Sequence, residues 1–206
     1  MHTRFQYTRE HVACGLCTEY HRRHGCTAFP CPWLAERIEA GAVGYEEALL
    51  ESFPHDARLL ARLQALVQIF PGSLWSGEDH RRRMEELKAQ LGYRKHRDTP
   101  AYCAAMYLLT ANRDLYARTA NCFCRHGLEF DYASLRDISP HNYTLFSAAR
   151  DIYTGAGSLS LNDLACRDVV DTPAFSLIIN ALLIARYGSA AFEIHNQRAD
   201  KSAPDL

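Results

Sequence analysis

The sequence Cys14-Gly15-Leu16-Cys17, followed by Cys26 and Cys31-Pro32-Trp33, holds four of the chain's eight cysteines within eighteen residues. A Cys-x-x-Cys pair offers two thiolates from one short turn, and a second pair completes the tetrahedral shell of a structural zinc ion. We therefore predict a zinc site formed by Cys14, Cys17, Cys26 and Cys31. The bound ion would fold a segment that is too short to build a hydrophobic core of its own.

Two alternatives for this site stay open. One of His11, His21 and His24 lies close enough in the sequence to replace a sulfur ligand, which would give three thiolates and one imidazole. An iron–sulfur cluster is the chemical rival, because a terminal Cys-Pro also occurs in ferredoxin ligand runs. The segment has little glycine to supply backbone N–H bonds to a cluster's sulfurs, so zinc is favoured.

The bulk composition is that of an ordinary soluble protein. The chain has 206 residues, 48% of them hydrophobic, and a formal net charge of −1, so no overall charge attracts it to nucleic acid or membrane. Met1 to Tyr7 lacks the apolar run of a secretory signal, and the longest apolar stretch, Leu177 to Ala185, is shorter than the ~20 residues of a membrane span. We expect a cytoplasmic protein without a membrane partner, and in a reducing compartment clustered cysteines favour a metal site. The sequence gives no prediction of the oligomeric state.

Apolar residues recur at helical spacing through most of the chain, which predicts an all-α fold. Thr99-Pro100, Ser139-Pro140 and Thr172-Pro173 each place an N-cap residue before a proline at the first helical position. The expected helices are 32–41, 44–53, 55–70, 78–91, 100–111, 140–154 and 173–187, with one from Asn112 toward Gly127 and a short one from Ser160.

We predict a small zinc-stabilised N-terminal module, with room for a short hairpin, packed on a multi-helix domain. The expected segments are a zinc-binding module at 1–43, a helical segment with a basic patch at 44–98, and a C-terminal helical domain at 99–206. The polar connector from Tyr93 to Asp98 is the candidate boundary between the last two.

A basic region runs from His80 to Arg97. It contains seven Arg and Lys residues and two Glu, a local charge of +5. Such a patch can contact phosphates or an acidic partner. The other interpretation is a solvated helix face whose arginines pair with Glu78, Asp79, Glu85 and Glu86. The candidate residues for binding a partner or nucleic acid, including two from the zinc module, are Arg22, Arg23, Arg81, Arg82, Arg83, Arg94, Lys95 and Arg97.

The remaining polar features are interpreted structurally. Cys103, Cys122, Cys124 and Cys166 are expected to be small packing residues in helices. Asn180 interrupts an apolar helical run, so its amide should be buried and hydrogen-bonded to a neighbouring helix end. No nucleophile elbow, phosphate loop or HExxH helix is present in the sequence, and we expect no catalytic residues.

Several stretches resemble a family of small proteins of Gram-positive gut bacteria, often carried on phages and integrative mobile elements. The similar stretches are the Cys14–Cys17 pair with Cys26, residues 31–41, His80-Arg81-Arg82-Arg83, residues 107–110 and residues 180–188. The resemblance implies a genomic context rather than an activity. Cargo proteins of such elements often act on host defence, and inhibitors of CRISPR effectors usually work by binding.

Two functions are therefore considered. The leading hypothesis is a non-enzymatic, zinc-stabilised interaction protein of a mobile element or phage. It would bind a host protein or ribonucleoprotein and inhibit or modulate it, in an anti-defence, anti-CRISPR-like manner. The alternative is a DNA- or RNA-binding transcriptional regulator that uses the zinc module and the basic patch at 80–97.

Overall fold

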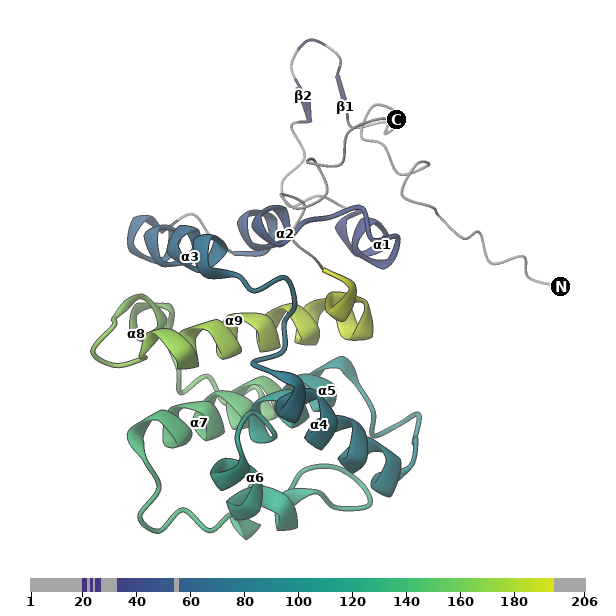
Figure 1. The fold of residues 1–206 in the computed structure, drawn as a ribbon, viewed down its shortest axis with the longest axis vertical. Coiled ribbons are helices and arrows are strands. Elements are labelled where there is room, and N and C mark those ends of the chain that lie inside the picture. The colour runs from purple at the N-terminus through teal and green to yellow at the C-terminus, as the bar shows by residue number, and fades with distance from the viewer. Residues whose placement is uncertain (1–19, 22, 24, 27–32, 54–55, 195–206) are drawn as a thin grey trace, which may run out of the picture. The chain divides into compact units, whose positions relative to one another are not determined.

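The computed structural model describes residues 20–21, 23, 25–26, 33–53 and 56–194, and these residues form two compact units (Figure 1). Unit 2 comprises Leu74–Ser189. Unit 1 comprises the described residues before Leu74 and those from Ala190 onward. The division falls inside the segment 44–98 of the sequence analysis, between the expected helices 55–70 and 78–91, and not at the Tyr93–Asp98 connector.

The described part of unit 1 before Leu74 contains a minimal hairpin and three helices. Strands β1 (Tyr20–His21) and β2 (Gly25–Cys26) pair antiparallel. Helices α1 (Leu34–Glu39), α2 (Tyr45–Ser52) and α3 (Ala57–Ile69) follow, each inside an expected helical range. Leu34 and Ile38 lie on the buried face of α1, and Trp33 does not share it. It is 49% exposed and lies just before α1.

A partly buried ion pair and a ring stack connect these three helices. Arg37 on α1 donates to Glu47 on α2 at 2.5 Å, and its side chain is 11% exposed. The Tyr45 ring at the start of α2 stacks on the Phe70 ring at the end of α3, with centroids 3.7 Å apart. Leu59, Leu63 and Leu66 supply the buried stripe of α3.

Unit 2 is built from six α-helices and short 3-10 turns. The α-helices are α4 (Glu78–Leu91), α5 (Pro100–Leu109), α6 (Arg113–Thr119), α7 (Pro140–Thr154), α8 (Leu161–Ala165) and α9 (Thr172–Tyr187). The 3-10 turns are η2 (Ala120–Cys122), η3 (Phe130–Tyr132) and η4 (Gly188–Glu193), which continues beyond the unit. An all-α fold is thus confirmed for the described residues.

The helix starts follow the predicted capping chemistry with one correction. Thr99 and Ser139 accept hydrogen bonds from the third backbone N–H of α5 and α7. At α9 the cap is Asp171, whose carboxylate accepts from Ala174 N at 2.7 Å, while Thr172 is already helical. A carboxylate satisfies the orphan N–H as well as a hydroxyl does and adds a favourable charge at the helix N-terminus.

The predicted helix from Asn112 toward Gly127 is wrong in length. Asn112 caps α6 as expected, accepting from Leu115 N at 2.9 Å. The α-helix ends at Thr119 and passes into η2, and Phe123 then pairs with Leu128 in an isolated bridge. The turn around Gly127 is therefore a tight loop rather than a helix end.

Helices α5, α7 and α9 pack against one another as the core of unit 2 (Figure 1). Both α5 and α9 are buried on most of their faces. In the part of the chain that the structure describes, one helical run, Thr172–Glu193, is long and apolar enough to cross a membrane, with a mean hydropathy of 1.5. Half of its apolar 18-residue stretch is buried inside the protein, and the core helix of a soluble protein can be equally long and apolar.

Candidate functional site

The predicted metal ligands lie almost entirely outside the described residues. Cys14, Cys17 and Cys31 fall there, as does Arg22, and of Cys26 only its backbone place in β2 is described. Within the described residues, no three His, Cys, Asp or Glu side chains gather as a metal-holding group. The zinc site therefore stays a prediction from the cysteine spacing.

The four cysteines outside that cluster are free thiols with different surroundings. Cys122 is buried in η2, and burial raises its pKa to about 11. Cys103 and Cys124 are partly buried. Cys166 is exposed just after α8, so the expectation of a buried helical residue was wrong there.

Two arginines of the basic region pair with acidic residues of their own helix. Arg81 donates to Glu85 at 2.8 Å, one turn further along α4. Arg82 donates to Asp79 at 2.5 Å and lies 3.9 Å from Glu86. All five of these side chains are exposed, so each pair contributes little to stability. The pairing nevertheless neutralises the charge that a phosphate would meet on this face.

Arg83 has a different role, because it binds the end of another helix. Its Nε donates to the carbonyl oxygen of Thr110 at 2.9 Å, and its Nη2 donates to that of Ala111 at 2.8 Å. These carbonyls follow the last turn of α5 and have no helical partner of their own. A cation there also complements the negative end of the helix dipole. Arg83 thus fixes α4 against the C-terminus of α5.

Arg97 also makes its hydrogen bonds within unit 2. Its side chain is 4% exposed, its Nε donates to Asp98 at 2.6 Å, and its Nη2 donates to the Gly92 carbonyl at 2.6 Å. Asp98 further accepts from the Arg94 backbone N–H at 2.8 Å. Partial burial alone would raise the pKa of the Asp98 carboxyl, but these bonds and the nearby positive charges together lower it. The connector from Tyr93 to Asp98 is therefore a loop held by hydrogen bonds to its own residues and to Gly92.

Within unit 2, the candidate binding residues do not form one exposed basic surface. Arg83 and Arg97 serve the fold, and Arg81 and Arg82 are paired along α4. Of the candidates that the structure describes, the exposed cations without such an internal role are Arg23 in the hairpin turn and Arg94 and Lys95 in the connector. Tyr93, beside these last two, is 79% exposed.

His80 opens the basic sequence His80–Arg83 but is not part of a surface patch. It is 1% exposed, and its Nε2 lies 2.8 Å from the Tyr107 carbonyl oxygen. Its Nδ1 lies 3.1 Å from the Ser76 hydroxyl and 3.4 Å from the Ser76 backbone N. A carbonyl only accepts, so Nε2 carries the proton and Nδ1 accepts. Burial lowers the pKa of His80 to about 4, with the Arg83 charge acting in the same direction.

A second group of buried polar side chains adjoins His80. Tyr107 donates its hydroxyl to the Leu74 carbonyl, and Asn180 donates to the same carbonyl at 3.2 Å and to the Tyr107 hydroxyl at 3.4 Å. The buried Asn180 amide is thus hydrogen-bonded, although to a loop carbonyl and a tyrosine rather than to a helix end. The chain entering α4 is thereby fixed to both α5 and α9.

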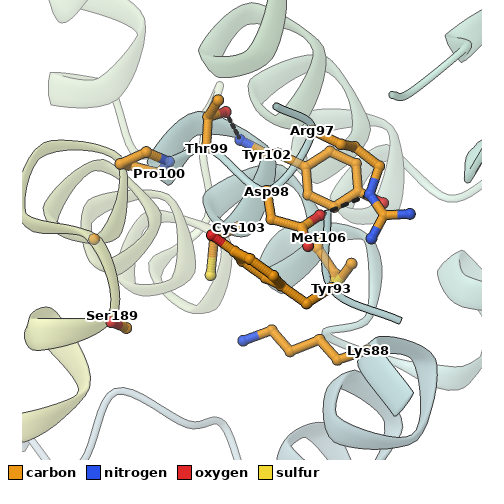
Figure 2. A pocket seen from close by; sticks show the side chains of 11 residues that line it. Lys88, Tyr93, Arg97, Asp98, Thr99, Pro100, Tyr102, Cys103, Met106 and Ser189 are labelled. Atoms are coloured by element: carbon orange, nitrogen blue, oxygen red, sulfur yellow. Dashed lines mark hydrogen bonds and ion pairs between the residues drawn. The ribbon is translucent and has the colours of Figure 1, made fainter. Parts of the chain in front are cut away.

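A cavity of about 490 Å³ opens where the connector meets the start of α5 (Figure 2). It lies within unit 2. Its walls combine apolar and polar side chains from α4, the connector, α5 and the end of α9: Lys88, Tyr93, Arg97, Asp98, Thr99, Pro100, Tyr102, Cys103, Met106, Gly188 and Ser189. This volume lies inside the range of about 300–1,000 Å³ that is typical of small-molecule pockets.

Two titratable side chains on α5 border the cavity. Tyr102 is 2% exposed, and its hydroxyl has no hydrogen-bond partner among the residues that the structure describes. Burial raises the pKa of Tyr102 to about 12, although the Arg97 charge opposes this. Burial also raises the pKa of the Cys103 thiol, against the lowering effect of the positive charge of Lys88. Both groups are therefore neutral at physiological pH.

Sequence reasoning missed the buried His80 and the cavity for different reasons. His80, Met84, Leu87 and Leu91 follow the i, i+4, i+7, i+11 spacing of one helix face, so the apolar stripe of α4 already contained the histidine. No local signal marks the cavity, because its walls come from segments up to a hundred residues apart in the sequence.

The comparisons with known proteins found no relative. Neither a protein-family model, nor a curated protein, nor a solved structure matches the chain.

Proposed function

We propose that this chain is a non-enzymatic, helical interaction protein of a mobile element or phage, with a structural zinc ion held by its N-terminal cysteines. It binds a host protein or ribonucleoprotein and inhibits or modulates it, in the manner of an anti-defence protein. The mobile-element context rests on the family resemblance described above. Cytoplasmic localisation is part of the same proposal.

One observation favours this proposal over a nucleic-acid-binding regulator: four of the candidate arginines already make contacts within the chain itself. Arg83 and Arg97 bind backbone carbonyls within unit 2, and Arg81 and Arg82 pair along α4. To bind phosphates, these arginines would have to give up their present contacts. Otherwise the phosphates would have to bind a surface that has little net positive charge. Residues 78–98 contain seven basic and five acidic side chains, a net charge of +2. A protein partner does not require a strongly basic surface.

One observation keeps the second candidate function, a DNA- or RNA-binding regulator, in view. Arg94 and Lys95 are exposed beside the exposed ring of Tyr93. Two cations next to an aromatic ring are the elements of a single-strand binding surface, where phosphates meet the cations and a base stacks on the ring. This surface is small, and we rank the regulator second.

One experiment separates the two functions. The full chain, tagged and expressed in a Gram-positive host, is recovered under mild conditions, and co-purifying proteins are identified by mass spectrometry. The same preparation is tested for gel shifts with duplex and single-stranded DNA and RNA over a range of salt concentrations. The double variant Arg94→Ala/Lys95→Ala is the nucleic-acid probe, and Arg81→Ala/Arg82→Ala is its matched control on α4.

We expect a stoichiometric protein partner and no specific gel shift. A shift that weakens steeply with salt and disappears in the Arg94→Ala/Lys95→Ala variant would instead support the regulator. Arg83 and Arg97 are left unchanged in both variants, since removing them would disturb the fold and confuse the result.

A further inference from the structure

We infer that residues 93–96, the first part of the connector, form a docking turn that meets an acidic surface of a protein partner. The protein partner is that of the proposed function, on which the inference rests. What is new is the surface of this chain that meets the partner and the chemistry that the partner must present there: carboxylates next to a place that takes an aromatic ring.

The docking turn consists of four consecutive exposed residues, Tyr93, Arg94, Lys95 and His96. The Tyr93 ring is 79% exposed, the largest exposed fraction of any large hydrophobic side chain in the part of the chain that the structure describes. Tyrosine and arginine are among the residue types that contribute most of the binding energy at protein interfaces. An exposed tyrosine followed directly by an arginine therefore favours a protein contact at this turn.

Hydrogen bonds at its base hold the docking turn in shape. The Arg94 carbonyl oxygen accepts from the Arg97 backbone N–H at 3.0 Å and from that of Asp98 at 2.9 Å. The Arg94 N–H donates to the Asp98 carboxylate, which Arg97 also binds (Figure 2). The Arg97 guanidinium further contacts the Gly92 carbonyl and lies 5.2 Å from the centroid of the Tyr102 ring on α5. Because the turn is already ordered, a partner that binds it loses little free energy to ordering.

The charge of the docking turn calls for a negatively charged partner. Arg94 and Lys95 give the turn a charge of +2, and the nearby Asp98 carboxylate is paired with Arg97. Complementary charge steers association and selects among partners. The Arg94 guanidinium can bind a carboxylate through two parallel N–H donors, a geometry that lysine cannot offer.

A protein suits this turn better than a nucleic acid does. Surfaces that bind single strands follow several phosphates along a basic groove and stack successive bases on several rings. The docking turn offers two cations and one ring, and the exposed Arg81 and Arg82 on α4 are paired with carboxylates. Two carboxylates and one aromatic side chain of a protein match what the turn offers.

The test uses the full chain and a fluorescein-labelled peptide in which glutamates flank one tryptophan. The same peptide with glutamine in place of every glutamate is the neutral control, and an oligothymidylate of equal charge is the nucleic-acid probe. Binding is measured by fluorescence anisotropy at low salt. We expect the glutamate peptide to bind about tenfold more tightly than the glutamine peptide, and more tightly than the oligothymidylate.

Matched variants locate the binding. Arg94→Ala/Lys95→Ala should abolish the preference for glutamate, whereas Arg81→Ala/Arg82→Ala removes the same charge from α4 and should keep it. Tyr93→Ala should weaken binding of the glutamate peptide about fivefold. Tyr132→Ala, which removes a ring that is 61% exposed in η3, should leave binding unchanged. Thermal denaturation checks that each variant is folded.

The inference is overturned if the glutamate peptide does not bind at millimolar concentration, if the two double variants lose binding alike, if Tyr93→Ala behaves like Tyr132→Ala, or if the oligothymidylate binds more tightly. Failure of the proposed function is a separate result, since a chain that co-purifies with no protein partner contradicts that function whatever the peptide does. A partner that the Arg94→Ala/Lys95→Ala variant retains would leave the proposed function standing and overturn the docking turn.

Discussion

The Nε2 atom of His80 on α4 lies 2.8 Å from the Tyr107 carbonyl oxygen on α5, and the two rings are 4.5 Å apart between centroids. The histidine is 1% exposed, and Ser76 contacts its other ring nitrogen. The neutral imidazole donates from Nε2 to Tyr107 on α5 and accepts at Nδ1 from Ser76 in the segment before α4. Protonation would leave the Tyr107 bond in place and would end the acceptor role of Nδ1. Arg83 adds a positive charge nearby that opposes protonation.

This arrangement predicts a specific acid sensitivity. The pKa of His80 is about 4 in the folded chain, against an ordinary value of 6.5. Because the folded pKa is lower than the unfolded one, protons bind the unfolded chain more readily. The contribution of the neutral His80 side chain to the free energy of unfolding is complete above pH 6.5 and is lost as the pH falls toward 4. Through this proton linkage, the free energy of unfolding should fall by about 3 kcal/mol over that range.

Urea unfolding at several pH values between 4 and 7 measures this effect. His80→Gln cannot titrate and should flatten the pH dependence of the unfolding free energy, whatever its effect at pH 7. His96→Gln, which changes an exposed histidine of the connector, should keep the native slope. Asp98 does not obscure the window, because its lowered pKa moves its contribution to a more acidic range. A His80→Gln variant with an unchanged slope would show that the buried imidazole is not responsible.

Two arginines of the basic region should lower the free energy of unfolding by very different amounts when each is changed to alanine. Arg83→Ala leaves the Thr110 and Ala111 carbonyls without their donor and should reduce the free energy of unfolding by about 1–3 kcal/mol. Arg82→Ala removes only an exposed pair and should cost less than about 1 kcal/mol. Thermal denaturation of the two variants side by side is the measurement. Equal losses would mean that the contact with the end of α5 adds nothing.

The corrected cap of α9 can be tested with neighbouring residues. Asp171→Ala removes the acceptor for Ala174 N and the partner of His141, so we expect a loss of about 1–2 kcal/mol. Thr172→Ala changes a residue inside the first turn and should stay within about 0.5 kcal/mol of the native protein. If Thr172→Ala lost more stability than Asp171→Ala in chemical denaturation, Thr172 and not Asp171 would be the cap of α9.

The helical pattern was predictable because its signals are local. Capping side chains, proline near the first turn and glycine beyond the last turn act within a few residues, so Thr99, Ser139 and Gly155 marked their helix ends correctly. At α9 two adjacent residues, Asp171 and Thr172, could both cap, and sequence alone did not decide between them. The Pro71-Gly72 pair just before Leu74 marks the end of α3, but a helix end does not by itself indicate a division between two units.

The roles of the basic residues could not be read from the sequence, because their partners are distant in it. Arg83 reaches carbonyls 27 and 28 residues further along the chain. Only packing of α4 against α5 makes those contacts. A count of +5 between residues 80 and 97 is therefore correct as composition and misleading as a surface property. The pairing of Arg81 and Arg82 with nearby carboxylates, in contrast, follows from helical spacing.

The predicted zinc ion is the part of the proposal that makes the N-terminal segment a folded module. Cys14→Ser and Cys31→Ser should each release the metal and unfold that segment, which limited proteolysis would detect. Cys166→Ser, which changes an exposed thiol outside the cluster, is the matched control. A Cys14→Ser variant with native protease resistance in chelator would contradict the site.

Elemental analysis of the purified full chain tests the zinc-stabilised module most directly. About one zinc ion per chain, lost in the Cys14→Ser and Cys31→Ser variants and kept in Cys166→Ser, is the expected result. If the analysis found iron and no zinc, the site would be an iron–sulfur cluster and not a structural zinc ion. A folded chain that contains no metal would contradict the module altogether.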